Sequence, residues 1–463
     1  MSLMCDARDI EVNVTWPGGP GTNQRLEKVP SRFAFAFENE DVKGMEEDCW
    51  GFGVPPGARS YGWFKLLLDK ARKTEYDVED VAGELTNGLL ELPTDMTAKE
   101  VVTAYLTKIY NHCMEMLEQR YTANILITTP IDFWLTVPAT WQAGAVDDTK
   151  AAAGSAGFGT RDGDTLNVIT EPEASGIAIL TEQAERNPEL IKAGDNAMIC
   201  DLGGGTQDMQ ILTIKAVKPQ VQLEEAVPGQ AGKCGSTFID QQFYQWMEET
   251  FGEAFTNLPK TKIGHGSKFM KDWEGVKAAF TGAAPNKQYY VPLPALGQAL
   301  GATGDHGVAS TAYDFMDNAV VLSGEDVERF FEPVVEKAFD LVDQQVSSLR
   351  RRKQGSTKLQ IICLCGGLGE SIYVWKRFND FCKDRFKGAV KLFTDKQAWS
   401  AVVRGAAIRG LNGNTVLSRK AKRAYGIGVH RPFREGIDQE EDSYHCPVGG
   451  KRAVGAVAWF IVV

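Results

Sequence analysis

The most informative stretch of this sequence is Ile199-Cys200-Asp201-Leu202-Gly203-Gly204-Gly205-Thr206-Gln207-Asp208. An apolar run ends in an aspartate, three glycines follow, and a second aspartate leads into another apolar run, which predicts a strand, a glycine turn and a strand. Because glycine has no Cβ atom, the N–H groups of such a turn can approach an anion closely. Asp201 and Asp208 are suited to hold a hydrated Mg²⁺, and the hydroxyl of Thr206 to contact a phosphate.

A plain β-hairpin, whose glycines only satisfy positive φ angles, is the alternative interpretation of this stretch. Such a hairpin needs one or two glycines, whereas this turn has three, framed by aspartates. The pattern therefore favours a phosphate-binding loop.

A second glycine-rich turn follows the apolar run Leu359–Leu364, where Gly366, Gly367 and Gly369 precede a predicted helix. Nucleotides dock where a strand ends at a helix N-terminus, although glycines at such junctions also serve packing alone. Glu171 occupies a third junction, where its carboxylate can orient a water molecule or simply favour the helix dipole.

Composition limits the classes of function. The chain has 463 residues, a net charge of −11 and nine cysteines without a C-x-x-C pair. This length allows two or three domains or one two-lobed unit, and the acidic balance argues against a nucleic-acid or anionic membrane partner. The cysteine usage indicates reduced thiols and a cytosolic or nuclear location, with Cys363 and Cys365 as buried, inert residues. The terminal apolar run Ala453–Val463 is too short to span a bilayer and predicts a strand.

Strand and helix patterns alternate along the chain, which predicts an α/β fold. The clearest helix is expected from a capping box of Thr97 and Glu100 onward to Tyr121. Further expectations are a strand over Leu26–Glu38, a helix over Tyr61–Lys73, a strand over Asn124–Thr128, a loop with one short strand over Gly282–Gly307, and a helix over Gly324–Arg352.

Several motifs in order resemble one family, the DnaK-type heat shock 70 chaperones of the actin-like ATPase superfamily. Their segments here are Val137-Pro138-Ala139, Asp147–Gly154, Glu171–Ala178, Asp201–Asp208, Gly232 with Gly235 and Asp240, Gly366–Ser371 and Gly405-Ala406-Ala407. The resemblance covers roughly residues 25 to 412. Trp141, Glu173 and Lys420–Gly426 are similar to the divergent 12A-like and fungal branch of that family.

The resemblance implies an actin-like ATPase fold, in which two lobes, each with a sheet flanked by helices, close over Mg-ATP. It assigns residues 1–190 to the first lobe and 191–397 to the second, whose outer subdomain spans about 232–318. Residues 398–412 would form a helix that crosses back to the first lobe. Residues 413–463 would be an extension without a complete peptide-binding domain.

The resemblance also implies roles for individual residues. Asp201 would organise the waters of Mg²⁺, with Asp208 also near the metal. The residues expected to act on the attacking water or the phosphates are Glu171, Asp208 and Lys65. The residues expected to bind the nucleotide are Asp201, Gly203, Gly204, Gly205, Thr206, Glu274, Lys277, Gly366, Gly367, Gly369 and Ser371.

Gly366–Ser371 resembles the family's adenosine loop, and Glu274 and Lys277, three apart on one helix face, resemble the pair that clamps the adenosine. This clamp departs from the family, because Ala278 and Thr281 replace its usual arginine and serine. A larger departure is the first phosphate loop, an aspartate followed by Gly-Thr-Thr, which has no counterpart; Gly18–Thr22 is interpreted as a surface turn. The first lobe is therefore expected to lack its opening β-hairpin, as in an N-terminally truncated chain.

The expected function is that of a chaperone-like ATP-binding protein whose hydrolysis is weak or lost. Its implied partners are ATP or ADP, Mg²⁺, client polypeptides and co-chaperones, with no nucleic acid and no membrane. A nucleotide-independent scaffold and another actin-like enzyme, such as a small-molecule kinase, remain the alternatives, because fold alone does not settle function.

Overall fold

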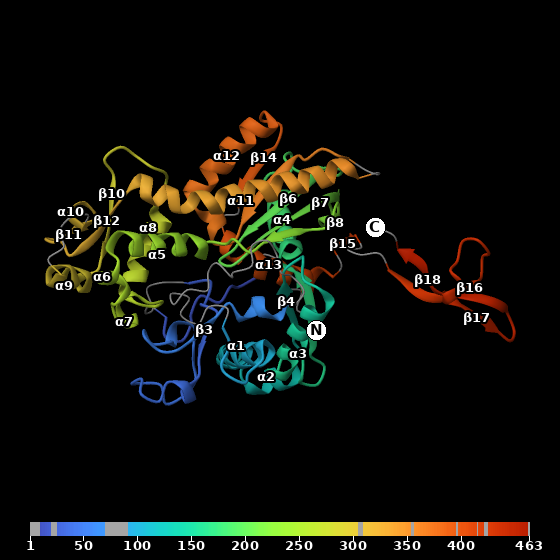
Figure 1. Cartoon of the computed structure of the whole chain (residues 1–463), viewed down its shortest axis with the longest axis horizontal. Helices are drawn as coiled ribbons and strands as arrows, with labels where there is room; N and C mark the ends of the chain where they lie inside the picture. Colours follow the sequence, from blue (N-terminus) through green and yellow to red (C-terminus); the bar gives the residue numbers. More distant parts are fainter. Residues whose placement is uncertain are drawn as a thin grey trace. The chain divides into compact units, whose positions relative to one another are not determined.

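The structure is a computed structural model that describes residues 10–19, 26–69, 91–303, 309–352, 356–394, 397–413, 415–420 and 425–461. The chain divides into two units, Met1–Leu417 and Ser418–Val463. Both contain β-sheet, and the described α-helices all belong to the larger unit (Figure 1). Among the described helices, none is long and apolar enough to cross a membrane.

A seven-stranded sheet is the largest sheet of the first unit. Its strand order is β14-β13-β6-β7-β8-β15, and β9 also pairs with β7. The three strands β14, β13 and β6 are parallel, whereas β7 returns antiparallel to β6. The bounds are β6 Asn196–Leu202, β7 Gln207–Ala216, β8 Gln222–Glu225, β9 Gln230–Gly232, β13 Ile361–Cys365, β14 Lys391–Thr394 and β15 Val416–Ser418.

Three smaller sheets complete the first unit. One has the order β2-β1-β3, one pairs β4 with β5 in parallel, and one has the order β10-β12-β11. Their bounds are β1 Arg32–Ala34, β2 Cys49–Trp50, β3 Tyr61–Gly62, β4 Asp132–Val137, β5 Thr165–Thr170, β10 Gln288–Pro292, β11 Tyr313–Asp314 and β12 Ala319–Ser323.

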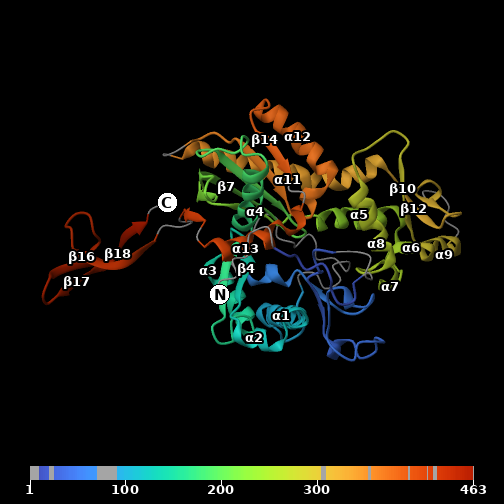
Figure 2. The same cartoon turned by 180° about the vertical axis from the view of Figure 1, so that it is seen from behind.

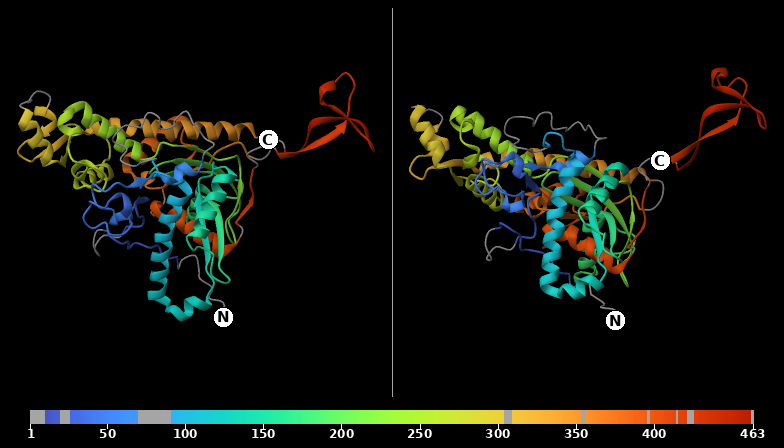
Figure 3. Two further views of the ribbon diagram at one scale, coloured as in Figure 1. Left: turned by 60° about the horizontal axis from the view of Figure 1, so that its bottom comes forward. Right: turned by 90° about the horizontal axis from the view of Figure 1, so that it is seen from below.

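The α-helices range from one turn to 28 residues in α11. Their bounds are α1 Ala98–Tyr121, α2 Ala123–Thr128, α3 Ala143–Ser155, α4 Glu171–Arg186, α5 Thr237–Phe251, α6 Glu253–Thr256, α7 Lys260–Ile263, α8 Lys268–Ala279, α9 Pro294–Thr303, α10 Ala309–Ala312, α11 Gly324–Arg351, α12 Ile372–Phe386 and α13 Ala401–Asn412. A short 3₁₀ helix, Phe64–Leu68, follows β3, and α1 packs against it and against α3 (Figure 3).

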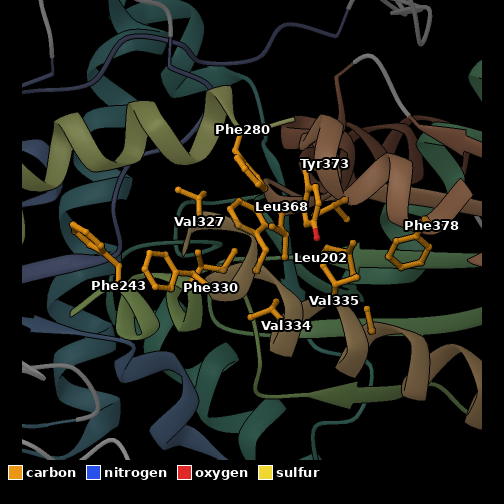
Figure 4. Close-up of a cluster of buried hydrophobic side chains, with 14 of the residues drawn as sticks. Leu202, Phe243, Phe280, Val327, Phe330, Val334, Val335, Leu368, Tyr373 and Phe378 are labelled. Carbon is orange, nitrogen blue, oxygen red and sulfur yellow. The ribbon is translucent and has the colours of Figure 1, made fainter. Parts of the chain in front are cut away.

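The large sheet separates two hydrophobic cores, as the alternation of side chains along β6 requires. Met198, Cys200 and Leu202 belong to a core that includes α5, α8, α11 and α12. Ala197 and Ile199 belong to the opposite core, with α4 and α13. Figure 4 shows part of the first core, where Leu202 lies among aromatic and branched side chains of the covering helices. Because both faces are covered, β6 is entirely buried.

The helices α4 and α13 cross in close contact, and α13 also touches β4 (Figure 2). A Cβ atom at Gly405 of α13 would lie 1.7 Å from the carbonyl oxygen of Ala174 in α4. Only glycine therefore permits the two backbones to approach this closely.

The second unit is a three-stranded antiparallel sheet with the order β16-β18-β17. Its strands are β16 Tyr425–Pro432, β17 Ser443–Cys446 and β18 Gly450–Ile461. The terminal strand expected over Ala453–Val463 is thus confirmed in its described residues.

Local signals predict several elements correctly. The capping box of Thr97 and Glu100 is present at the beginning of α1. The glycine hairpin is formed by β6 and β7, and the long helix expected over Gly324–Arg352 is α11. Cys363 and Cys365 are buried on the same side of β13, as expected.

Four expectations from the sequence are wrong in part. Asn124–Thr128 is helical in α2, not a strand. Only Leu126 of the run is buried, and so short an apolar run does not distinguish a helix from a strand. The expected loop over Gly282–Gly307 contains α9, which begins with a proline in its first turn and buries Leu296 and Leu300 four residues apart.

The strand expected over Leu26–Glu38 is limited to Arg32–Ala34. The helix expected over Tyr61–Lys73 is instead β3 and the 3₁₀ helix, separated by Trp63 with a φ of 58°. Residues 70–73, Pro20–Thr22 of the expected surface turn, Met1–Arg8 and residues 421–424 lie outside the described residues.

We expect Gly405→Ala to destabilise the first unit by at least about 2 kcal/mol, because the added methyl would overlap the backbone of α4. Urea denaturation followed by circular dichroism measures the change. Gly275→Ala is the control, since that exposed site in α8 has open space for a Cβ and alanine favours a helix. Equal stability of Gly405→Ala and wild type would show that α4 and α13 can separate without cost.

Candidate functional site

Two aspartates face one another where β6 and β7 meet. Asp201 is the register partner of Asp208, and both side chains are buried. Gly366 closes the other side, because a Cβ there would lie 2.4 Å from Oδ1 of Asp201, and its φ of +80° also favours glycine. The two glycine turns expected from the sequence are therefore brought together at Asp201.

The three glycines turn their carbonyl groups toward the beginning of α5. Gly203 and Gly204 accept hydrogen bonds from the backbone N–H groups of Ser236 and Thr237, each 3.0 Å long, and Gly205 accepts one from Gly235 at 3.3 Å.

In a trans peptide unit, the N–H that follows each carbonyl points the opposite way. The amides of Gly204, Gly205 and Thr206 are therefore directed away from α5. A Cβ on Gly205 would lie 3.7 Å from Leu66, so the turn borders the 3₁₀ helix that contains Lys65. Successive N–H groups of this kind form a concavity suited to an anion.

An ion pair joins two further residues expected at the site. Nζ of Lys65 donates to a carboxylate oxygen of Glu171, the first residue of α4. The Lys65 side chain is 42% exposed and Glu171 13% exposed, so the pair lies at the border of the buried carboxylates. Nζ of Lys65 also lies 5.6 Å from the ring centroid of Trp141.

The site has an excess of negative charge. Burial, followed by repulsion from Glu171, raises the pKa of Asp201 to about 6, although Lys28 and Lys65 oppose the shift. Burial and the carboxylates of Glu171 and Asp201 also raise the pKa of Asp208. Burial lowers the pKa of Lys65, but the three carboxylates outweigh it and raise that pKa above its ordinary value.

The residues present fit a phosphate ligand with a divalent cation. Oδ1 of Asp208 is buried and has no hydrogen-bond partner in the described part of the chain. No group of three or more His, Cys, Asp or Glu side chains there is arranged to hold a metal by itself. Mg²⁺ usually retains waters and uses one or two carboxylates together with phosphate oxygens, so Asp201 and Asp208 suit an ion that arrives with its ligand.

Glu274 and Lys277 form a second group on α8. Nζ of Lys277 contacts Oε2 of Glu274 at 2.7 Å and Oδ1 of Asp240 at 2.8 Å. The Lys277 side chain is buried, and Asp240 also accepts a hydrogen bond from the indole of Trp273. The expected pair on one helix face is present, but its lysine is anchored by Asp240, a partner that the spacing on α8 does not reveal.

The turn expected to bind adenosine is covered by a tryptophan. The indole Nε1 of Trp399 donates to the carbonyl of Gly367 at 3.4 Å, and a Cβ on Gly367 would lie 3.3 Å from the same nitrogen. Gly369 is buried, and Ser371 caps α12 by accepting from the N–H of Val374. Trp399 and Lys28 were not expected at the site, because no local motif marks them. Lys28 belongs to the site because its charge lowers the pKa of Asp201.

We expect stability to fall as pH rises from about 4 to about 6, since the pKa of Asp201 is about 6 in the folded chain against an ordinary 3.8. The folded state retains its proton over that window while the unfolded state loses it, so ionised Asp201 costs about 3 kcal/mol above pH 6.

Asp201→Asn should therefore exceed wild type in unfolding free energy at pH 8 without nucleotide or divalent cations, and match it near pH 4. Asp162→Asn, at an exposed position, is the control. Urea titrations across this pH range provide the test, and a less stable Asp201→Asn at pH 8 would contradict the electrostatic interpretation.

No protein-family model matches the chain. The chain is 21% identical to heat shock 70 kDa protein 12A of Mus musculus, over 76% of this chain and 60% of that protein. It is also 21% identical to heat shock 70 kDa protein 12B of Homo sapiens, over 94% of this chain and 70% of that protein. Chaperone protein DnaK of Thermoplasma volcanium is 23% identical over 60% of this chain and 40% of its own length.

The chain thus spans about 60% of the length of the 12A protein that it matches. Its mixed α/β architecture is compatible with an actin-like ATPase fold. These similarities support the assignment of the chain as a divergent, heat shock 70-like member of the actin-like ATPase family.

Proposed function

We propose that this chain is a chaperone-like ATP-binding protein, and that its ATP hydrolysis is weak or lost. The observation that carries the proposal is the orientation of the glycine turn. The carbonyls of Gly203–Gly205 are occupied by the beginning of α5, which leaves the amides of Gly204, Gly205 and Thr206 directed away from α5, in a turn that borders the 3₁₀ helix containing Lys65. Backbone amides beside a lysine are the donors that a polyphosphate requires.

In this proposal the amides of the turn and Thr206 hold the β- and γ-phosphates. Asp201 and Asp208 hold the waters of Mg²⁺, which supplies positive charge to the phosphates when it is bound. Lys65 contacts a phosphate, and Glu171 with Asp208 positions the attacking water. The raised pKa of Asp201 supports a site that is incomplete without added positive charge.

The adenosine is proposed to lie along the turn formed by Gly366, Gly367, Gly369 and Ser371. Glu274 and Lys277 would clamp it from α8. Asp240 supports this role, because it fixes the ammonium of Lys277 at 2.8 Å. Ala278 provides no guanidinium for stacking on the base, so the purine would be held more loosely than in the family pattern.

Weak hydrolysis follows from an incomplete first lobe. We propose that residues 1–190 form this lobe and 191–397 the second, with an outer subdomain near 232–318. The described sheet built by β4 and β5 has two strands, which supports a first lobe without its opening hairpin. One Mg²⁺-side aspartate and half of the phosphate clamp would then be missing.

Residues 398–412 would cross back between the lobes and residues 413–463 would extend beyond them. Closure of the lobes near Gly405 would couple nucleotide to a surface for client polypeptides or co-chaperones. A cytosolic or nuclear location is part of the same proposal, supported by free buried thiols such as Cys363 and Cys365.

A nucleotide-independent scaffold is the second candidate function. It is favoured by Ala278 at the base clamp and by the missing first phosphate loop. The two candidates differ in one property, since a scaffold has no saturable nucleotide site.

We expect Mg-ATP to bind wild type with one saturable site and to bind Asp201→Asn at least about tenfold more weakly, because the variant loses a carboxylate that holds the metal waters. Isothermal titration calorimetry measures both, with Asp162→Asn as the matched control. The variant is expected to be the more stable protein, so its weaker binding cannot come from unfolding. An absence of binding to folded wild type would instead support the scaffold.

Residual hydrolysis should depend on Glu171. We expect Glu171→Gln to bind ATP within about threefold of wild type and to lower the single-turnover rate by about a hundredfold, since it no longer positions a water as a carboxylate does. Rapid-quench measurement of ADP formation tests this expectation. Equal rates in the two proteins would remove Glu171 from the proposed mechanism.

A further inference from the structure

We propose that Lys28 is a second phosphate-binding lysine and that Trp399 holds it beside the glycine turn at Gly366 and Gly367. The ligand class is the phosphate chain of a nucleoside di- or triphosphate. This inference rests on the proposed function, because it adds a residue to the same site.

Trp399 is fixed on the turn by two polar contacts and by packing. Its indole nitrogen donates to the carbonyl of Gly367 at 3.4 Å, and its backbone N–H donates to Oε1 of Glu370 at 3.1 Å. The indole fills the space where a side chain of Gly367 would begin. Since the preceding residue, Gly366, packs on Oδ1 of Asp201, the indole is one residue removed from the buried carboxylates.

Lys28 reaches this indole from a distant part of the chain. Its Nζ lies 5.9 Å from the centroid of the Trp399 ring, within the range of a cation–π contact. The indole in turn contacts Gly367, and the preceding Gly366 lies against Asp201, so packing connects the position of this ammonium to the glycine turn beside the carboxylates.

The backbone near Lys28 is held in place. Leu26 donates its N–H to the carbonyl of Val14 and accepts a hydrogen bond of 2.8 Å from the indole of Trp16. The Trp16 ring lies 6.4 Å from that of Trp50, which belongs to β2. A lysine on such an anchored segment has its position set by the fold, while its four-carbon stem remains adjustable.

Charge balance explains why a second lysine is useful here. Glu171, Asp201 and Asp208 bring three carboxylates together, and Lys65 pairs with one of them. A polyphosphate adds further negative charge beside these groups. An exposed cation–π contact is worth only about 0.5–1 kcal/mol, so the ammonium of Lys28 can exchange it for a stronger, charge-assisted hydrogen bond to a phosphate.

Calorimetry with ATP, ADP and adenosine in the presence of Mg²⁺ tests the inference on the full chain. We expect Lys28→Met to weaken ATP and ADP about tenfold and adenosine not at all, because only the phosphates meet the ammonium. Lys28→Arg should restore most of the affinity, since it retains the charge. Lys43→Met, at an exposed lysine in the same part of the chain, is the control and should bind like wild type.

Trp399 is a positioning residue in this proposal. Trp399→Ala should weaken ATP about as much as Lys28→Met, and Trp399→Phe should retain binding, because a phenyl ring also offers a cation–π face. In the double variant Lys28→Met with Trp399→Ala the losses should not add. A destabilised fold alone would explain neither the retained binding of Trp399→Phe nor the non-additive losses in the double variant.

The outcomes separate this inference from the proposed function. If wild type binds ATP, Asp201→Asn does not, and Lys28→Met binds like wild type, the inference about Lys28 is overturned while the ATP site stands. A parallel loss for adenosine in Lys28→Met would also overturn it, because the lysine would then act on the base or on folding. If wild type binds no nucleotide, both are overturned.

Discussion

The burial of Asp201 and Asp208 beside a third carboxylate, Glu171, is the constraint around which the site is built. Asp201 and Asp208 oppose one another across two paired strands, and Glu171 raises the pKa of both. Burying charges without full compensation costs free energy that packing elsewhere must offset. Within the described residues, Lys65 supplies a direct ion pair to Glu171, while Lys28 acts on Asp201 through its field. A ligand that brings cations would therefore relieve a strain already present in the fold.

The rigidity of the large sheet is what allows this strain to persist. β6 is buried on both faces by two separate cores, so Asp201 stands near the end of a strand that cannot easily move. Glu171 belongs to a different part of the fold. It is the first residue of α4, directly after β5, and α4 packs against the same sheet. Because α4 and α13 touch at Gly405, the position of Glu171 is tied to the helix packing behind it.

The elements that the sequence predicts correctly are those formed by interactions between near neighbours in the chain. The capping box at Thr97 and the hairpin around Gly203–Gly205 were predictable because their hydrogen bonds join near neighbours in the chain. The exposed run Asn124–Thr128 was misassigned, since a short apolar run does not reveal which residues are buried. The structure joins Lys65 to Glu171, a pair that the resemblance implied for one site. The contact of Lys28 with Trp399 was not predictable, because it depends on tertiary packing between distant segments.

A site of this kind links stability to occupancy. Ionised Asp201 destabilises the empty fold, so any ligand that neutralises it gains binding free energy from the relief of that strain. By the same linkage, the loss of a carboxylate should stabilise the empty protein and lower its affinity for the ligand. A divalent cation that arrives with a polyphosphate would supply the positive charge that Asp201, Asp208 and Glu171 lack, whereas a scaffold without a ligand would gain stability from the loss of these carboxylates.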